Sequence, residues 1–534
     1  MKSPFIKRLC VSVCAALAAG NAQAVYLSTN GTGQVLIYPY YTVRNGFNTL
    51  LSVTNTQNNT KVLKVHFLEG MNGRDVMNFN LFLAPNDTWT AVIADTARGA
   101  RLLTNDNSCV APSDLFTETR LLTGTTQTFN EFYNFQYIAT RQDNPAFSTL
   151  DRTREGYFEI IEMGVIDAAL SSTAAQIIGF AKPDSSTTNC AALDAFNNSF
   201  LIPGSIQFPN SGAQLMAPPR GGLKGWASLI NAASGANYTF RPTVLDGWSS
   251  QVAYSGMGVI RGTQLRDAFP AISMVTTPAG VSIVQWEVGR DAVSAVLMRE
   301  SVSNDFVLDA GTASQTDWIV TFPTKPFYTD SSYPETNSGY LSSPFVGGFS
   351  YAATGVASCE VFTTSIVNRE GNPSGEDPML MPFPPLTPPA WGKSSLCGVT
   401  NVVPFVGSRT ELESPPVGLL GAPAPSVLSF SYYRTYALIL GATSSASPLT
   451  SPSLRGLVGP NGRATFLFDK SPQLAEPHAG VVPILVSPSG TQTNIKGKFA
   501  GLPVIGLMLH NYKNTNVVSR YGGVIEHSYS VRVE

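Results

Sequence analysis

The chain repeatedly alternates apolar and polar residues over segments of strand length. In the segment KVLKVHFLE at residues 61–69, Leu63, Val65 and Phe67 share one face, while Lys64 and His66 share the other. Residues 78–83 and 88–93 repeat this pattern. Because successive side chains of a strand point to opposite sides of a sheet, a period of two predicts strands with one buried and one solvated face.

The same spacing predicts how neighbouring strands connect. Residues 48–56 and 61–69 flank the polar stretch QNNT, which has the length and composition of a β-hairpin turn. Residues 78–83 turn through APND into residues 88–93, and four antiparallel strands with short polar turns are typical of a β-sandwich. Further strands are expected at 34–43, 156–163, 281–288, 317–322 and 358–369, in a second hairpin within 223–245, and at 426–439, 463–468, 496–510 and 524–533.

Helices are expected to be few and short. Residues 167–178 are predicted as a short helix, and Asp291 is predicted to cap a helical turn that runs to Arg299. Residues 184–198 are predicted to form a loop. Because proline fixes φ and lacks a backbone donor, the proline-dense stretches within residues 373–425 are expected to be extended loops.

The expected fold class is all-β: two or three antiparallel β-sandwich domains with Greek-key connections, few short helices and long Pro/Gly loops. At about 150 residues per domain, the 534 residues have room for several domains. We expect an N-terminal β-sandwich domain at 25–200, a middle β region at 201–345 and a C-terminal β region at 346–534, which contains the Pro-rich loop 373–425.

Residues 1–24 have the features of a secretory signal peptide. The segment opens with three basic residues, continues with an apolar core at residues 9–18, and ends on the small-x-small sequence AQA. The core is shorter than the roughly 20 residues that cross a bilayer, and no later segment has 18 consecutive apolar residues. We therefore expect export to the periplasm, the outer cell surface or the medium, with no transmembrane segment after cleavage.

Four cysteines follow the predicted signal peptide: Cys109, Cys190, Cys359 and Cys397. An even number in an exported chain favours disulfides, and four cysteines allow three pairings. We favour the sequence-local pairs Cys109–Cys190 and Cys359–Cys397, each of which would close a loop-rich stretch. A zinc site with four cysteine ligands is the alternative, but the chain has no C-x-x-C pair to support it.

Charged residues make up only 13% of the chain, whereas ordinary soluble domains have about 25%. The formal net charge of −2 and the lack of a Lys/Arg-rich stretch exclude a basic nucleic-acid binder. We expect surfaces covered by Ser, Thr, Asn and Tyr. We expect no cofactor, and the expected partners are other envelope or surface proteins, or glycans.

Motifs of common enzyme classes are missing. The chain has no G-x-S-x-G elbow, no P-loop and no G-x-G-x-x-G between a strand and a helix. The four histidines show no metal-ligand spacing: His66, His478, His510 and His527. His66 is predicted to be solvated on the polar face of its strand. His510 and His527 lie at strand ends where they can meet in space, although structural roles are favoured.

Glu159 and Glu162 are the most glycosidase-like local feature, since that reaction needs two carboxylates. An offset of three places them on opposite faces of a strand, so solvated edge charges are the favoured interpretation. Glu287 is a second candidate acid, although its neighbour Trp286 is expected in the core. The NDN sequence at residues 105–107 lacks the spaced oxygen ligands that Ca²⁺ needs, so a loop is expected there.

Two groups of tyrosines stand in otherwise polar segments. They are Tyr38, Tyr40 and Tyr41, and Tyr328, Tyr333 and Tyr340. Exposed rings would bind sugars or partner proteins by stacking. The favoured interpretation is that the rings are buried and the hydroxyls hydrogen-bonded.

Three segments carry a resemblance to known proteins: VLIYPYYTVRNGFNTLLSVTNT, GLKGWASLINAASGANYTF and TDWIVTFPTKPFY. They resemble a group of exported proteins of Gram-negative bacteria with no assigned activity, which implies secretion and a shared β architecture but no catalytic residues. The hairpin expected within residues 48–69 is similar to the first hairpin of immunoglobulin-like domains in bacterial surface proteins.

We therefore expect an exported, non-enzymatic structural or binding protein of the bacterial envelope or cell surface. The alternative is a secreted hydrolase that acts on carbohydrate or another polymer with acids from distant loops. A cleft holding two carboxylates about 5–10 Å apart would favour the hydrolase. A flat surface, or a sheet edge long enough to recruit another chain, would favour binding and assembly.

Overall fold

A computed structural model describes the chain in segments that together span residues 23–534. The described residues are 23–116, 118–122, 125–137, 149–183, 185–186, 188–199, 215–256, 262–308, 312–330, 344–345, 359–371, 380–383, 394–406, 434–438, 461–468, 472–473, 479–513 and 520–534. Strands dominate these residues, and the paired strands run antiparallel apart from β24 and β25. The predicted all-β class is confirmed. The predicted signal peptide falls almost entirely outside the described residues.

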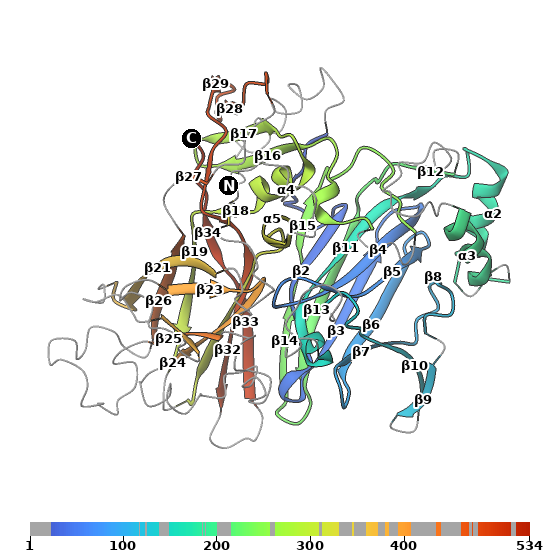
Figure 1. The fold of residues 1–534 in the computed structure, drawn as a ribbon, viewed down its shortest axis with the longest axis horizontal. Helices are drawn as coiled ribbons and strands as arrows, with labels where there is room; N and C mark the ends of the chain where they lie inside the picture. Colours follow the sequence, from blue (N-terminus) through green and yellow to red (C-terminus); the bar gives the residue numbers. More distant parts are fainter. Residues whose placement is uncertain are drawn as a thin grey trace, which may run out of the picture.

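Two large sheets form a first sandwich, on the right in Figure 1. Sheet 1 has the order β1 (Tyr26–Leu27), β15 (Thr243–Asp246), β2 (Val35–Thr42), β11 (Glu155–Ile166), β4 (Thr60–Glu69), β5 (Asp75–Leu83) and β8 (Val110–Ala111), with β12 (Met216–Ala217) on β11. Sheet 2 has the order β14 (Ala236–Phe240), β13 (Leu223–Asn231), β3 (Asn48–Asn55), β6 (Thr88–Asp95), β7 (Ala100–Thr104), β10 (Thr125–Glu131) and β9 (Glu118–Leu122). Their facing side chains, such as Val65 of sheet 1 and Trp89 of sheet 2, form one core.

The strands at residues 48–56 and 61–69 exist as predicted, but the hairpin between them is wrong. β3 pairs with β6 and β13 in sheet 2, whereas β4 pairs with β5 and β11 in sheet 1. Stacked sheets lie about 10 Å apart, which four residues can span at roughly 3.3 Å each. The QNNT stretch is therefore a crossover between sheets, and the likeness to an immunoglobulin-like first hairpin loses its basis.

Two further sheets form a second sandwich, on the left in Figure 1. Sheet 3 contains β23 (Ser394–Cys397), β21 (Cys359–Asn368), β26 (Asn461–Phe468), β19 (Ser301–Val307) and β34 (Ser528–Ser530). Sheet 4 contains β22 (Leu380–Phe383), β25 (Arg434–Leu438), β24 (Thr400–Val406), β20 (Gln315–Thr321), β32 (Ile505–Lys513) and β33 (Arg520–Glu526). Phe466 of sheet 3 and Trp318 of sheet 4 meet in its core. The other face of sheet 4 contributes Leu507 and Leu509 to the core of the first sandwich, so the two sandwiches are packed together.

A small sheet and two helices cover part of the outer face of sheet 1. Sheet 5 comprises β16 (Ile272–Thr277), β17 (Gly280–Gln285), β28 (Ile484–Val486) and β29 (Gln492–Asn494), and it lies with α4 (Gly289–Leu297) at the top of Figure 1. Ile161 of sheet 1 shares a buried cluster with Trp286 and with Val293 of α4. The short helix α5 (Pro326–Thr329) joins the same cluster. This outer face is therefore buried rather than solvated.

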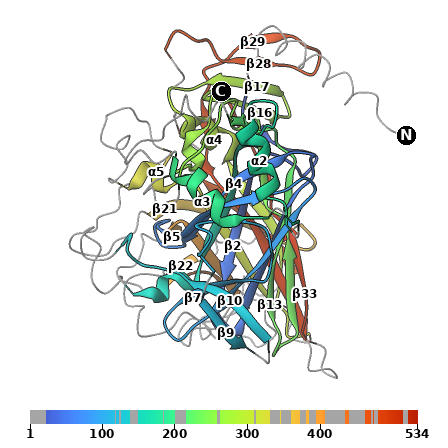
Figure 2. The ribbon, with the colours of Figure 1, turned by 90° about the vertical axis from the view of Figure 1, so that its right-hand side faces the viewer.

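The helices α2 (Ser172–Phe180) and α3 (Cys190–Ser199) pack together beside β8, at the side of the first sandwich that faces the viewer in Figure 2. The predicted helix at 167–178 is confirmed as α2, whose first turn is capped by the Ser171 hydroxyl. The loop predicted at 184–198 is wrong over α3, where the Asn189 side chain accepts from the Ala192 amide at 3.1 Å. That side-chain contact gives the helix a start signal.

The remaining elements are short. They are β18 (Met298–Arg299) with β31 (Leu502–Pro503), β27 (Pro472–Gln473) with β30 (Phe499–Ala500), and the 3-10 turns η1 (Arg44–Gly46), η4 (Leu150–Arg154) and η6 (Leu265–Asp267). The predicted helix near Asp291 is α4, but the predicted cap is wrong because Val288 occupies that position. Asp291 lies in the first helical turn, where a carboxylate suits the helix dipole.

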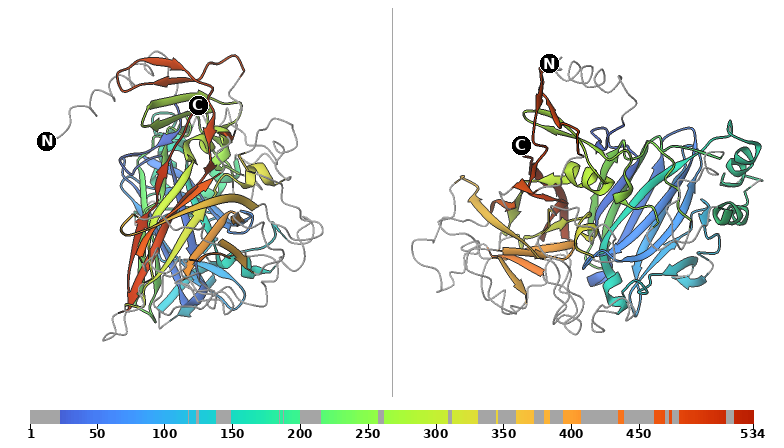
Figure 3. Two further views of the ribbon diagram at one scale, coloured as in Figure 1. Left: turned by 90° about the vertical axis from the view of Figure 1, so that its left-hand side faces the viewer. Right: turned by 45° about the horizontal axis from the view of Figure 1, so that its top comes forward.

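Hydrogen-bonded sheets cut across the predicted division at residues 200 and 345. β13, β14 and β15 come from the predicted middle region but complete sheets 1 and 2. β19 and β20, from the same region, belong to the second sandwich. Figure 3 shows both sandwiches side by side in its right-hand view, each assembled from segments far apart in the sequence.

Candidate binding site

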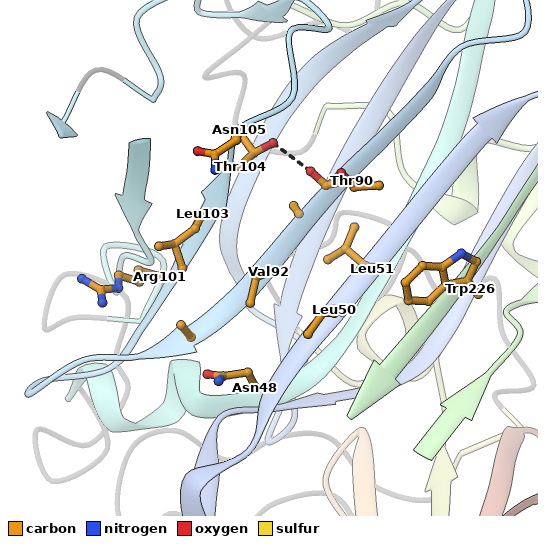
Figure 4. Close-up of a pocket in the computed structure, with 12 residues that line it drawn as sticks. Asn48, Leu50, Leu51, Thr90, Val92, Arg101, Leu103, Thr104, Asn105 and Trp226 are labelled. Carbon is orange, nitrogen blue, oxygen red and sulfur yellow. Dashed lines mark hydrogen bonds between the residues drawn. The ribbon is translucent and has the colours of Figure 1, made fainter. Parts of the chain in front are cut away.

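The outer face of sheet 2 is open to solvent over β3 and β6. On β3 and β6 the outward positions hold Asn48, Leu50, Thr88, Thr90 and Val92, all exposed or half-buried. A shallow depression of about 550 Å³ lies over β13, β3, β6 and β7 (Figure 4). Its lining comprises Asn48, Leu50, Leu51, Thr90, Ala91, Val92, Ala94, Arg101, Leu103, Thr104, Asn105 and Trp226.

Trp226 forms one side of this depression, as Figure 4 shows. Its side chain projects from β13 and is 40% exposed, whereas Trp89, Trp248 and Trp318 are fully buried. The preceding residue, Gly225, lets the Tyr38 hydroxyl reach the Ser52 carbonyl of β3 at 2.9 Å. A Cβ at residue 225 would lie 2.0 Å from that hydroxyl, so only glycine fits this position. The backbone beside Trp226 is therefore held rigidly against β3.

Polar groups surround the apolar floor of the depression. Asn48 and Asn105 present amides, Thr90 and Thr104 present hydroxyls, and Arg101 is the charged residue of the lining. The Thr104 hydroxyl donates to the Thr90 carbonyl at 2.8 Å, which fixes the two strands at this edge. An exposed indole beside hydroxyl, amide and guanidinium groups can stack on an apolar ring face and hydrogen-bond at its rim.

His66 does not lie on a solvated surface, so that prediction is wrong. The ring is 2% exposed, and it contacts Asp75 Oδ2 through Nε2 at 2.8 Å and Glu159 Oε1 through Nδ1 at 3.3 Å. Burial opposes the charged ring, but the two carboxylates outweigh it and raise the pKa of His66 to about 9. With both nitrogens bound to carboxylates, the ring has no lone pair for general-base catalysis.

Asp75 is the hub of this cluster, and sequence reasoning missed it. Besides His66, it accepts from the Tyr133 hydroxyl at 2.8 Å and the Asn78 amide at 2.5 Å. Burial opposes its charge, yet His66 and the hydrogen bonds lower the pKa of Asp75 below its ordinary value. The sequence feature that points to this buried polar cluster is the pair Lys64 and His66, because both lie in a strand that is buried on both faces.

Glu159 and Glu162 are buried, so the prediction of solvated edge charges is wrong. Glu162 pairs with Lys61 at 2.7 Å, with both side chains fully buried, and accepts from the Gly221 amide at 2.8 Å. Glu159 faces His66 instead. Each acid has its own partner, so the two carboxylates do not form the paired arrangement that glycoside hydrolysis needs.

Further buried ion pairs link η1 to η4 and β11, and η4 to β4. Arg44 contacts Asp151 at 2.8 Å and Glu155 at 3.1 Å, and Arg152 contacts Glu69 at 3.0 Å. These pairs hold the chain together at one end of sheet 1. Nothing in a single sequence reveals them, because the partners are about 80 to 110 residues apart.

The remaining sequence candidates have structural roles. Tyr38, Tyr40 and Tyr41 are fully buried with hydrogen-bonded hydroxyls, and Tyr328 donates to Asp291, as the favoured interpretation predicted. Trp286 is buried, as predicted. The acid Glu287 accepts from the Ala479 amide, and residues 105–107 form the predicted loop.

His510 and His527 do not meet. His510 contacts Tyr512, whereas His527 is buried between Asn304 and the Ile319 carbonyl. His478, Tyr333 and Tyr340 lie outside the described residues.

The structure contains the predicted Cys109–Cys190 disulfide, with the two Cα atoms 5.2 Å apart. It joins α3 to the strand region at β8. Cys359 and Cys397 are register partners on the neighbouring strands β21 and β23. Their side chains are not described, so the second disulfide stays a prediction.

Within the described segments, no group of three or more His, Cys, Asp or Glu side chains is arranged to hold a metal ion. Among the same residues, no helix has both the length and the apolar character needed to cross a membrane. Comparison of the chain with protein-family models, curated proteins and solved structures gives no match in any of the three.

Proposed function

We propose that the protein is an exported, non-enzymatic binding component of the bacterial envelope or cell surface, and that its ligand is a glycan held against sheet 2. The observation that carries the proposal is the open face of sheet 2, with its shallow depression and the exposed indole of Trp226. Export is supported by the features of residues 1–24 and by the disulfide, which persists in oxidising compartments.

A glycan suits this surface better than a peptide for two reasons. The depression is wide and shallow and lies across several strands, so it offers area to a flat ring rather than a deep pocket to one side chain. Its lining combines apolar side chains with hydroxyls and amides and contains little charge, which complements the apolar faces and hydroxyl edges of a sugar.

Retention of the mature protein on an array of bacterial surface polysaccharides tests the proposal. We expect binding that Trp226→Ala weakens at least tenfold, while Phe269→Ala, which removes a similarly exposed ring elsewhere, leaves binding unchanged. Equal binding by wild type and Trp226→Ala, or retention of no glycan, would contradict the proposal. Selective retention of surface proteins instead would identify a protein-binding face.

Cell fractionation tests export separately. We expect the protein outside the cytoplasm with Val25 as its first residue. A cytoplasmic protein that keeps residues 1–24 would contradict it.

A further inference from the structure

Lys64 and Asn80 form an unusual buried pair on the outer face of sheet 1. They are register partners on the adjacent antiparallel strands β4 and β5. The Lys64 side chain is 1% exposed and Asn80 is fully buried. The lysine Nζ lies 3.5 Å from the Asn80 Oδ1, at the outer limit of a hydrogen bond. Lys64 forms no ion pair with any residue that the structure describes.

A buried ammonium group with one long hydrogen bond is costly, because its charge is removed from water with only partial compensation. Lys61, three residues earlier on the same strand, shows the usual solution: its Nζ lies 2.7 Å from the Glu162 carboxylate. Lys64 faces a carboxamide instead of a carboxylate. This contrast requires an explanation other than charge pairing.

We propose that Lys64 and Asn80 are joined by an intramolecular amide bond between the two strands. The neutral Lys64 amine attacks the Asn80 carboxamide carbon, so that a Nζ–Cγ bond forms and the Cγ–Nδ2 bond breaks. One proton moves from Nζ to Nδ2, which departs as ammonia. No oxidant, reductant or other reactant is needed, and no net charge changes when the amine is neutral.

The surroundings favour this reaction. Burial, only partly opposed by Asp75, lowers the pKa of Lys64 to about 8, so the nucleophilic neutral amine is populated near neutral pH. The Asn80 Nδ2 donates to the Ser255 carbonyl at 3.0 Å, which fixes the plane of the carboxamide. Register pairing holds both groups in place, which supplies the proximity such a reaction depends on.

Neighbouring residues close the site from water. Val62 and Phe82 lie two positions from Lys64 and Asn80 on the same two strands, and both belong to a buried apolar cluster that also includes Tyr254. Gly262 lies over the lysine stem: a Cβ at that residue would be 3.5 Å from Lys64 Cε. The next pair on the same face of the ladder is His66 with Asn78, and His66 is bound to Asp75. The Asp75 carboxylate, whose charge acts on Lys64, is the group we assign to carry the proton.

Mass spectrometry of the full mature chain, denatured and reduced, tests the proposal directly. We expect the wild type to be lighter than its sequence by the mass of one ammonia molecule. Proteolysis should release a branched peptide that joins the segments containing Lys64 and Asn80. Lys64→Met and Asn80→Ala should each restore the full sequence mass, whereas Lys61→Met should keep the deficit.

The wild-type measurement decides the matter even where a variant fails to fold. Full sequence mass, with Lys64 and Asn80 recovered in separate unmodified peptides, would overturn the proposal. A deficit located on the Asn80 peptide alone would also overturn it, since that result indicates a succinimide. Asp75→Asn should leave a measurable fraction of uncrosslinked protein. Complete crosslinking in that variant would show that Asp75 does not carry the proton.

Discussion

At the scale of single residues, His66 shows how this protein stabilises charge in its interior. Its folded pKa of about 9 lies above the ordinary value of 6.5, so the charged ring stabilises the fold below about pH 6.5. This contribution is lost as the pH rises towards 9. By linkage, the difference corresponds to a free energy on the order of 3 kcal/mol.

We therefore predict that His66→Gln removes a pH dependence as well as stability. In the wild type, the contribution of His66 to the free energy of unfolding should fall between pH 6.5 and pH 9. In His66→Gln, the free energy of unfolding should be lower at pH 6, because Asp75 and Glu159 lose their cation. Its decrease between pH 6.5 and pH 9 should be smaller than in the wild type. Urea unfolding at the two pH values measures both effects. His510→Gln, at a less buried ring, serves as the control; equal pH slopes in His66→Gln and wild type would contradict the prediction.

Lys61 and Glu162 give a second prediction at this scale. Lys61→Met leaves the fully buried Glu162 carboxylate without its cation, and such losses typically cost about 3–5 kcal/mol. Adding Glu162→Gln removes the charge and keeps one acceptor oxygen, for either the Arg220 or the Gly221 amide, so we expect part of the stability to return. Denaturant unfolding of the single and double variants tests this. A double variant no more stable than Lys61→Met would show that the pair matters through packing alone.

At the scale of elements, the period of two in residues 61–69 correctly located β4 and its inner face. The sequence did not show that the outer face is also covered, because sheet 5, α4 and the loop at Ser255 come from residues about 190 or more positions away. For the same reason the sequence pattern predicts, wrongly, that Lys64, His66 and Glu159 are exposed to solvent. The alternation of a strand distinguishes its two faces, but it does not say how each is covered.

The predicted hairpin between β3 and β4 is wrong for a related reason. Four polar residues can close a hairpin or cross between stacked sheets, and local composition is the same in both cases. The choice depends on β6 and β13 pairing with β3, and β13 begins 168 residues after β3 ends. The open face of sheet 2 could not be predicted either, because it exists only after β13 has joined β3.

The Cys109–Cys190 disulfide gives a prediction about α2 and α3. Closing a loop with a sequence separation of 81 stabilises by about 4 kcal/mol in the loop-entropy model. We expect Cys190→Ser to increase hydrogen exchange in α2 and α3 while the core strands β4 and β11 stay protected. Peptide-resolved hydrogen exchange measures this. Unchanged exchange in both helices would show that packing alone holds them.

The register of β21 and β23 sharpens the second disulfide prediction. Cys359 and Cys397 lie directly opposite each other across the ladder, where neighbouring strands bring side chains close together. Peptide mapping without reduction should recover these two cysteines linked. Free thiols at either position would contradict the prediction.

At the scale of the whole molecule, the two sandwiches share buried surface. One face of sheet 4 contributes Trp318 to the core of the second sandwich, and the other face contributes Leu509 to the core of the first sandwich. We predict a single cooperative unfolding transition in calorimetry. Leu509→Ala should lower the free energy of unfolding by about 2–5 kcal/mol and move the whole transition to a lower temperature. Two transitions, with only one shifted by the substitution, would contradict this picture.

The low charge of the chain takes on a clearer meaning in the structure. A part of the small charged set is not on the surface at all: Lys61, Lys64, Lys325, Arg152 and Glu159 are each at most 1% exposed. The lining of the depression on sheet 2 contains Arg101 as its charged residue beside threonine, asparagine and apolar side chains. Such a surface favours stacking and hydrogen bonding over electrostatic capture, which agrees with a glycan ligand.

Collisional quenching of the Trp226 indole tests the proposed binding face most directly. The difference between wild type and Trp226→Phe isolates this indole, which is 40% exposed, from the buried Trp89, Trp248, Trp286 and Trp318. We expect acrylamide to quench this indole in the free protein and a polysaccharide retained by the wild type to protect it. Unchanged quenching of Trp226 at saturating polysaccharide would contradict the claim that sheet 2 is the binding face.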